Sequence, residues 1–442
     1  MMKRILLTLL TLTLAIISFS ITAQAQEPVE TVKVRTRVVF MDALVKDKRT
    51  GTPVADLTQD SFEVLDNGKA RSLTYFTQMG QARKPLALTL VLDVRPDGAG
   101  RFLQRKEVQD AIVAELSKLP ADDEVAVLII GLDDKDDNER LWVMNWTNNR
   151  AETAQALAQI PALIEKYTDH DDEDQKIPSD SKVEVKNQDK GKVEVNVNTE
   201  PGKPETVKID TDEIEKGKTT TTIVGKNGAV VTRTVDKDGN ARVTRVSKNK
   251  HVTVEMDNDL YMYAPIEEIT KRAAKERANS QPAIIWVSDG LAPVFYEERN
   301  EAEALMIRSG VIFNSLNTDL KTVYKFLLPI AKPITNWVGF NIYGASQHMA
   351  KQTGGEAIKV HRADDYARGL NKIVGNLTAR YNLGFTLEEA EQDDGTMHQL
   401  EVRVRARDAK GKTRKLEVRS RRGYFMPKPF EKQEEKTTAS TN

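Results

Sequence analysis

The sequence contains no cysteine, which excludes disulfide cross-links, thiolate metal sites and a cysteine nucleophile. Aromatic residues make up only 6% of the 442 residues and charged residues 30%, which indicates that part of the chain packs poorly. The formal net charge of -1 gives no general attraction to nucleic acid or to an anionic membrane. We therefore expect no nucleic-acid partner. The length of the chain allows two or three domains.

Long hydrophobic runs are also scarce, since only the run at the start of the chain is apolar enough to cross a membrane. Met1 to Arg4 is a short basic region, Ile5 to Ile21 is apolar, and Ala23-Gln24-Ala25 has the small-x-small pattern of a signal-peptidase site. This pattern predicts a signal peptide over residues 1–25, cleaved near Ala25, and a periplasmic or extracellular protein. The alternative is an uncleaved membrane anchor. We expect no integral membrane span in the mature chain.

Short alternating strand patterns occupy both ends of the mature chain. Residues 30–80 contain such patterns between turn sequences like Asp66-Asn67-Gly68, which predicts an N-terminal β-sandwich module. Residues 380–426 alternate in the same way, most strictly at Leu400 to Arg405, and predict a C-terminal β module. We expect residues 427–442 to be a disordered tail.

Strands and helices alternate between these two modules. Leu86 to Leu92 is a near-continuous apolar run, typical of a strand that is buried on both faces. Val108 and Ile112 follow at helical spacing. The pattern recurs over residues 84–168 and 258–379. It predicts an α/β domain, split in sequence, with a doubly wound sheet covered by helices on both faces.

Residues 169–257 interrupt this domain and have a different composition, dominated by lysine, glutamate, threonine and valine. Gly225-Lys226-Asn227-Gly228 and Asp238-Gly239-Asn240 each suit a hairpin turn. We therefore predict a charged, partly disordered insertion that contains β-hairpins.

Acidic groups follow two of the predicted central strands. Asp93-Val94-Arg95-Pro96-Asp97 comes at the end of the first apolar strand, and Ser288-Asp289-Gly290 at the end of a later one. Because the carboxyl ends of parallel strands meet at one edge of a sheet, the carboxylates of Asp93, Asp97 and Asp289 are expected to lie close together. Such oxygen ligands suit a hard cation, whereas the guanidinium of Arg95 is a poor neighbour for one.

The chain resembles the von Willebrand factor type A (VWA) domain proteins, and most closely the exported VWA-related group described from acidobacteria. Six landmarks carry the resemblance, and their order and spacing make it more specific than any one of them. These landmarks are Asp60-Ser61-Phe62-Glu63-Val64-Leu65-Asp66-Asn67-Gly68, Leu86 to Asp93, Val287-Ser288-Asp289-Gly290, Ala350-Lys351-Gln352-Thr353-Gly354-Gly355, Arg380-Tyr381-Asn382-Leu383-Gly384-Phe385 and Arg422-Gly423-Tyr424-Phe425.

The resemblance implies a Rossmann-like VWA sheet whose top edge holds a metal-ion-dependent adhesion site. The family pattern is Asp-x-Ser-x-Ser, a threonine from a middle loop, and an aspartate after the fourth strand; a partner's carboxylate completes the shell of a bound Mg²⁺. Asp93 and Asp289 match the two aspartates, but Arg95 and Asp97 replace both serines. No threonine is evident at the expected middle loop near Asp257-Asn258-Asp259. The insertion enters at this loop, so we expect it to lie beside the site.

Two interpretations of this edge remain. In one, Asp93, Asp97 and Asp289 hold Mg²⁺, with Asp259 as a fourth carboxylate. In the other, which we favour, the adhesion site is degenerate, no cofactor binds, and Arg95 takes the place of the cation by pairing with Asp93 or Asp289. In both interpretations, the edge of the sheet that meets a partner is marked by the same residues, which are Asp93, Arg95, Asp97, Asp259, Ser288 and Asp289.

No catalytic constellation is evident in the sequence. The five histidines lack metal-ligand spacing on any one element, and no nucleophile elbow, Walker loop or dinucleotide fingerprint is present. We therefore predict a non-catalytic exported protein that mediates protein–protein interaction in the cell envelope or outside the cell. The alternatives are a structural scaffold whose β modules bind, and a metal-assisted hydrolase that uses the carboxylate cluster.

Overall fold

The computed structural model describes residues 37–79, 81, 83–95, 99–131, 140–167, 219–224, 228–235, 240–247, 250–257, 262–318, 339–388, 390–391 and 394–427. The expected signal peptide, the first part of the insertion (169–218) and the tail after residue 427 lie outside these residues. The chain divides into two units, 1–37 and 38–442, and the elements below all belong to the second. In the described part of the chain, no helix has the length and apolarity required to cross a membrane.

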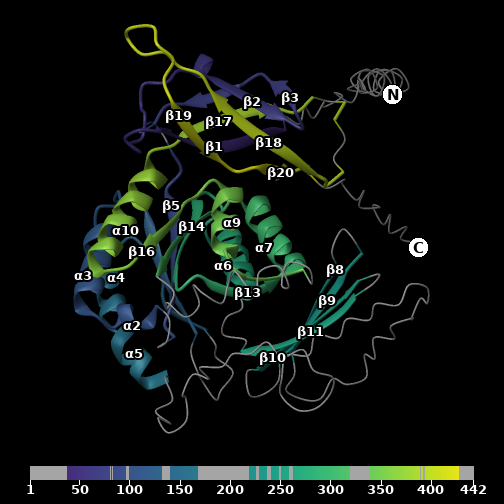
Figure 1. Cartoon of the computed structure of the whole chain (residues 1–442). Helices are drawn as coiled ribbons and strands as arrows, with labels where there is room; N and C mark the ends of the chain where they lie inside the picture. The colour runs from purple at the N-terminus through teal and green to yellow at the C-terminus, as the bar shows by residue number, and fades with distance from the viewer. Residues whose placement is uncertain are drawn as a thin grey trace, which may run out of the picture. The chain divides into compact units, whose positions relative to one another are not determined.

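A six-stranded mixed sheet, flanked by helices, forms the centre of an α/β fold (Figure 1). Its strands are β5 (Leu86–Asp93), β6 (Glu124–Ile130), β7 (Arg140–Thr147), β12 (Gln281–Ser288), β14 (Ile312–Thr318) and β16 (Ala357–Val360). Across the sheet the order is β7-β6-β5-β12-β14-β16, and only β7 runs antiparallel to its neighbour. The order reverses between β5 and β12, so the sheet is doubly wound, and its switch point lies between these two strands.

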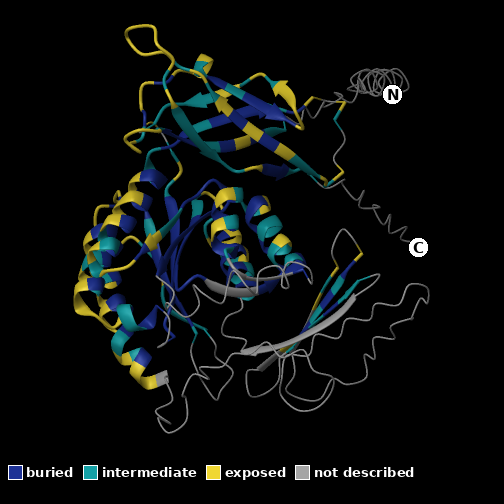
Figure 2. Ribbon diagram, viewed as in Figure 1, coloured by how far each residue is buried: buried dark blue, intermediate teal, exposed yellow. Residues whose placement is uncertain are grey.

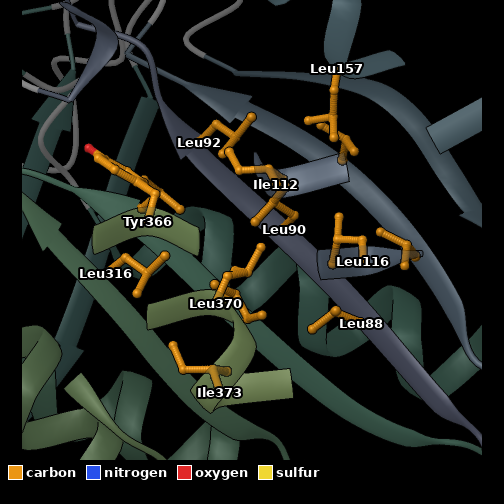
Figure 3. Close-up of a cluster of buried hydrophobic side chains, with 14 of the residues drawn as sticks. Leu88, Leu90, Leu92, Ile112, Leu116, Leu157, Leu316, Tyr366, Leu370 and Ile373 are labelled. Atoms are coloured by element: carbon orange, nitrogen blue, oxygen red, sulfur yellow. The ribbon is translucent and has the colours of Figure 1, made fainter. Parts of the chain in front are cut away.

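Helices cover both faces of this sheet because its strands are apolar on both sides. The helices are α2 (Gly100–Leu103), α3 (Lys106–Leu116), α4 (Arg150–Ala158), α5 (Ile160–Tyr167), α6 (Tyr263–Glu276), α7 (Tyr296–Ser309), α9 (Ala345–Thr353) and α10 (Ala363–Thr378). Leu90 points to the face covered by α3 and α10, and its neighbour Val91 packs on the face covered by α6, α7 and α9. Figure 2 shows the resulting layer of buried strands, and Figure 3 the first of these two cores. The central strand and helix predictions are confirmed.

The two terminal β regions do not form separate modules, and this part of the sequence-based prediction is wrong. Their strands are β1 (Val38–Asp47), β2 (Phe62–Asp66), β3 (Lys69–Arg71), β4 (Tyr75–Thr77), β17 (Tyr381–Thr386), β18 (Met397–Val404), β19 (Leu416–Ser420) and β20 (Gly423–Phe425), with a 3-10 turn at Gln59–Ser61. They form two sheets, of order β19-β1-β17-β4 and β20-β18-β2-β3, and each sheet contains strands from both regions. Residues of both sheets share one core, where the rings of Phe62 and Tyr381 lie 5.0 Å apart.

The physical reason for this error is that alternation predicts a strand but not its partner. In β1, Met41 pairs with Leu383 and Val45 with Val418, although more than 300 residues separate each pair along the chain. Few strands on their own would leave unpaired edges and be only marginally stable. Interleaving the strands of both ends satisfies these edges in a single two-sheet unit.

A buried ion pair joins this two-sheet unit to the α/β sheet. The ammonium of Lys46 in β1 donates to a carboxylate oxygen of Glu356, the residue before β16, and both side chains are almost fully buried. Asn376 of α10 donates to the other carboxylate oxygen. Beside them the backbone approaches closely, because a Cβ on Gly354 would stand 2.7 Å from the carbonyl carbon of Ser420. Gly354 also has a φ of +80°, which favours glycine.

The described part of the insertion is an antiparallel sheet of order β11-β10-β9-β8. Its strands are β8 (Thr219–Val224), β9 (Val230–Val235), β10 (Asn240–Ser247) and β11 (Lys250–Asp257). The two predicted turn sequences lie between β8 and β9 and between β9 and β10, so the expected hairpins are present. A third hairpin, between β10 and β11, was not predicted from the sequence.

We expect the Lys46→Met substitution to destabilise the protein by about 3–5 kcal/mol, because it leaves the Glu356 carboxylate buried without its main partner. Chemical denaturation measures this change. Lys106→Met is the matched control, since Lys106 pairs with Asp110 on the exposed surface of α3 and should change the unfolding free energy by less than about 0.5 kcal/mol. Equal effects of the two substitutions would contradict the structural role of the buried pair.

Acid should weaken the same junction. Burial acts to raise the pKa of the Glu356 carboxyl, but the hydrogen bond from Lys46 and the charges of Lys46, Lys372 and Arg419 outweigh it and lower that pKa below 4.5. A carboxyl whose pKa is lower in the folded state stabilises the fold above its unfolded pKa, and this contribution is lost as the pH falls through the folded value. Denaturation of Glu356→Gln and of the unmodified protein between about pH 6 and about pH 3 should give curves that converge toward low pH. A constant difference would contradict this assignment.

Candidate functional site

The candidate site lies at the carboxyl edge of the central sheet, at its switch point. Asp93 is the last residue of β5, and Asp289 directly follows Ser288, the last residue of β12. These strands are parallel neighbours, with Leu92 paired to Val287. The pairing brings together two aspartates that are almost two hundred residues apart in sequence.

The Arg95 guanidinium lies between these two carboxylates. Its Nε donates to Asp93 Oδ1 at 2.8 Å and its Nη2 to Asp93 Oδ2 at 2.5 Å, a bidentate arrangement. The same Nη2 donates to Asp289 Oδ1 at 3.2 Å. The exposed fractions are 8% for Arg95, 2% for Asp93 and 6% for Asp289, so the three charges are buried together. The ion pair predicted with one aspartate is therefore present with both.

Local backbone structure holds Arg95 in place. The Val94 amide donates to the Ile130 carbonyl at 3.0 Å, and the Gly100 amide donates to the Arg95 carbonyl at 3.0 Å. Gly131, directly after β6, has a φ of +76°, and a Cβ there would lie only 2.6 Å from Arg95 Cγ. Sequence reasoning missed Gly131; the only signal for it was a glycine placed directly after an apolar strand.

Other polar residues line the same edge and hold the strand ends in place. The Ser288 hydroxyl accepts from the Gly290 amide at 3.0 Å, and the Thr318 hydroxyl donates to the Ser288 carbonyl at 3.2 Å. Ser346 donates to the side chain of Asn317 at 3.3 Å. The side chains of Ser288, Asn317, Thr318 and Ser346 are all buried. Thr318, Asn317 and Ser346 were not among the predicted site residues, because a single polar residue at a strand end is a weak signal.

The remaining predicted site residues, Asp97 and Asp259, lie outside the described residues. Over the residues that are described, no group of three or more histidine, aspartate or glutamate side chains is arranged to hold a metal ion. The described oxygen ligands do not fit Mg²⁺, because the carboxylates of Asp93 and Asp289, which would face the ion, already accept hydrogen bonds from Arg95. Two like charges about 4 Å apart repel by roughly 4 kcal/mol at an effective dielectric constant near 20, and a divalent ion would be repelled more strongly by the guanidinium.

The described part of the insertion packs against the first turn of α7. Arg233 of β9 donates to Glu298 at 3.0 Å, and Arg245 of β10 donates to both carboxylate oxygens of Glu297 at 2.8 and 2.9 Å. All four side chains are buried. Glu297 and Glu298 lie in the first turn of α7, where the helix dipole favours negative charge. Two buried ion pairs therefore hold the insertion against the helix that follows Asp289 and β13 (Leu291–Phe295).

A two-stranded ribbon completes the described part of this region. β13 pairs antiparallel with β15 (Phe340–Tyr343), and the Tyr296 amide donates to the Gly339 carbonyl at 3.0 Å. A Cβ on Gly339 would lie 3.1 Å from the Arg245 guanidinium carbon. The ribbon, the insertion and the start of α7 therefore meet at one place.

In comparisons with known proteins, no protein-family model matches the chain, and no curated protein matches its sequence. The functional assignment therefore depends on the sheet topology and on the geometry of the three buried charges.

We expect calorimetric titration of the protein with Mg²⁺, Mn²⁺ or Ca²⁺ to show no binding tighter than about millimolar, because both carboxylates already accept hydrogen bonds from Arg95 and its guanidinium repels a cation. Arg95→Ser removes the guanidinium and places a hydroxyl oxygen, a possible metal ligand, at this position. This variant should bind Mg²⁺ at least about tenfold more tightly, and adding Asp289→Ala should abolish the gain. Micromolar binding by the unmodified protein that Asp289→Ala removes would overturn the ion-pair interpretation.

Proposed function

We propose that the chain is an exported, non-catalytic binding protein whose central domain is VWA-like and whose sheet edge near Asp93 and Asp289 engages a protein partner. It would act in the cell envelope or outside the cell. The observation that carries the proposal is the placement of Arg95 between the two aspartates at the switch point of the sheet. In the VWA family a metal ion occupies the corresponding place between strand ends and recruits a partner.

The topology of the central sheet supports the VWA-like assignment. Numbered along the chain within the sheet, the strand order is 3-2-1-4-5-6, with the third strand antiparallel at one edge. The first strand, β5, ends at Asp93, and Asp289 follows the fourth, β12. The resemblance places the two family aspartates at these strand ends.

A site with an internal guanidinium recognises a partner differently from one with a metal. A bound metal ion can offer a free coordination position to a partner's carboxylate. Arg95 offers none, and its N–H groups that face Asp93 and Asp289 already donate to these two residues. Recognition then depends on the shape and polarity of the edge, together with the insertion sheet that two buried ion pairs hold beside it. Such an interaction does not depend on the concentration of divalent ions.

An affinity-capture experiment from the native envelope, quantified by mass spectrometry, tests this proposal. The first variant replaces Asp93→Asn, Arg95→Met and Asp289→Asn together, so that no buried charge is left without a partner. We expect capture to fall at least about tenfold, the effect of losing roughly 1.4 kcal/mol of binding free energy. A second variant lacks residues 170–216 but keeps the strands β8 to β11, and we expect it to retain part of the binding.

The control is the double substitution Lys106→Ala and Asp110→Ala, which removes an exposed ion pair on α3. It should capture the partner as the unmodified protein does. If both the edge variant and the deletion keep full capture while remaining folded, the edge is not the binding surface. That outcome would favour the alternative in which the terminal β strands bind and the α/β domain acts as a scaffold.

A further inference from the structure

A cavity of about 430 Å³ lies at the opposite edge of the central sheet from Arg95. Leu86 and Gln281, the first residues of β5 and β12, line it, so it is at the amino ends of these strands. Strands β1 and β17 of the two-sheet unit contribute its other wall. Its volume is within the range of small-molecule sites. The side chains that matter for its chemistry are Phe40, Asp42, Tyr75, Lys84, Arg380 and Arg421.

Two arginines, one buried and one partly buried, give the cavity positive charge. Arg380 is only 7% exposed, and Nη2 of its guanidinium donates to the Gly354 carbonyl at 2.8 Å. Arg421 donates to the carbonyls of Phe40 and Ile307. In each arginine the Nε atom is buried with no hydrogen-bond partner in the described part of the protein. Burial lowers the pKa of Arg380, and the charges of Asp42 and Glu356 oppose this effect. Each guanidinium group therefore keeps one donor that the described residues leave unused.

Asp42 is the acidic group of the cavity, and it does not neutralise these charges fully. Burial raises the pKa of its carboxyl, although the charges of Arg380, Arg421 and Lys84 act in the opposite direction. Arg83 also lines the cavity, but both of its terminal nitrogens donate to Asp123, at 2.8 and 2.7 Å.

The formal charge that remains at the cavity is about two positive units. Lys84, Arg380 and Arg421 carry three positive charges, and Asp42 carries one negative charge. A ligand with one negative charge is attracted by this surplus. A second negative charge on the ligand would also be repelled by the Asp42 carboxylate.

An aromatic pair lines the same cavity. The rings of Phe40 and Tyr75 lie 5.2 Å apart in an edge-to-face arrangement, with exposed fractions of 54% and 40%. The described residues leave three large apolar side chains exposed, and these two are among them. Exposed aromatic surface beside convergent polar groups is typical of a ligand site.

A purely structural explanation accounts for only part of this arrangement. A second void of about 10 Å³ shares Asp42, Arg380 and Arg421 and is about large enough for one water molecule. One water can bridge this carboxylate and the guanidinium groups. It explains neither the larger cavity nor the aromatic pair beside it.

We propose that this cavity binds a small carboxylate with one negative charge and an apolar or aromatic body. The carboxylate lies against Arg380 and Lys84, and the body packs on Phe40 and Tyr75. The same chemistry occurs in a free organic acid and in the C-terminal residue of a peptide. Because the site lies at the amino ends of the strands, it is independent of the partner edge proposed above.

Isothermal titration with phenylacetate and with the neutral phenylacetamide tests the proposal. We expect saturable binding of phenylacetate, at least about tenfold tighter than that of the amide, because only the acid forms charge-assisted hydrogen bonds. A tripeptide ending in phenylalanine, with a free or an amidated C-terminus, distinguishes the two sources. Binding of the free tripeptide alone identifies a peptide end, and binding of phenylacetate as well identifies a free organic acid; either result supports the proposed chemistry.

Two variants that should leave the fold intact locate the binding. Lys84→Gln removes an exposed charge, and Tyr75→Ala removes exposed ring surface; each should weaken phenylacetate binding by about three- to tenfold. Lys106→Gln, on the exposed surface of α3, is the control and should leave the affinity unchanged.

Three outcomes would overturn the proposal. They are the absence of saturable binding by every carboxylate probe, equal affinity for acid and amide, and tighter binding of inorganic phosphate than of phenylacetate. An unchanged affinity in both Lys84→Gln and Tyr75→Ala would show that the carboxylate binds elsewhere.

Discussion

Backbone pairing between strands from the two ends of the chain is the constraint on which most of this structure depends. β1 lies between β17 and β19, and β2 lies between β18 and β3, so neither terminal region has a complete sheet without the other. The closure brings Lys46 to Glu356 and brings the backbone of Ser420 against Gly354. It also forms the wall of β1 and β17 that borders the cavity. The ends of the chain therefore create the junction with the α/β sheet and the space beside it.

The Arg95 ion pair solves a problem that the topology creates. A doubly wound sheet with one aspartate at the end of β5 and another directly after β12 brings two carboxylates close together at the switch point, where they repel each other. A bound cation can cancel this repulsion, but it must be taken up from solution. Arg95 supplies the charge from within the chain, and Gly131 leaves the space that its side chain requires. The guanidinium offsets the repulsion between the two carboxylates, and this is the physical basis for the weak metal binding that we expect.

The two edges of the central sheet consequently differ in their electrostatics. At the carboxyl edge, Arg95 pairs with Asp93 and Asp289, and the insertion arginines pair with the first turn of α7. At the amino edge, Arg380 and Arg421 line a cavity in which Asp42 is the one acidic residue among the described lining side chains. The first edge suits recognition of a surface by shape and polarity, and the second suits an anion. The proposed functions of the two edges follow from this difference in charge compensation.

The sequence by itself determined the central elements and part of the candidate site. The apolar run of β5, the helical spacing of Val108 and Ile112, and the hairpin turns of the insertion depend on local periodicity and turn chemistry, which neighbouring residues encode. The meeting of Asp93 with Asp289 could be predicted because parallel strand ends share one edge. The tertiary structure alone decided the pairing of β1 with β17 and β19, the role of Gly131 beside Arg95, and the cavity around Arg380. These features depend on contacts between residues far apart in the chain, and no local pattern of apolar and polar residues specifies which distant partner a strand or a charge will meet.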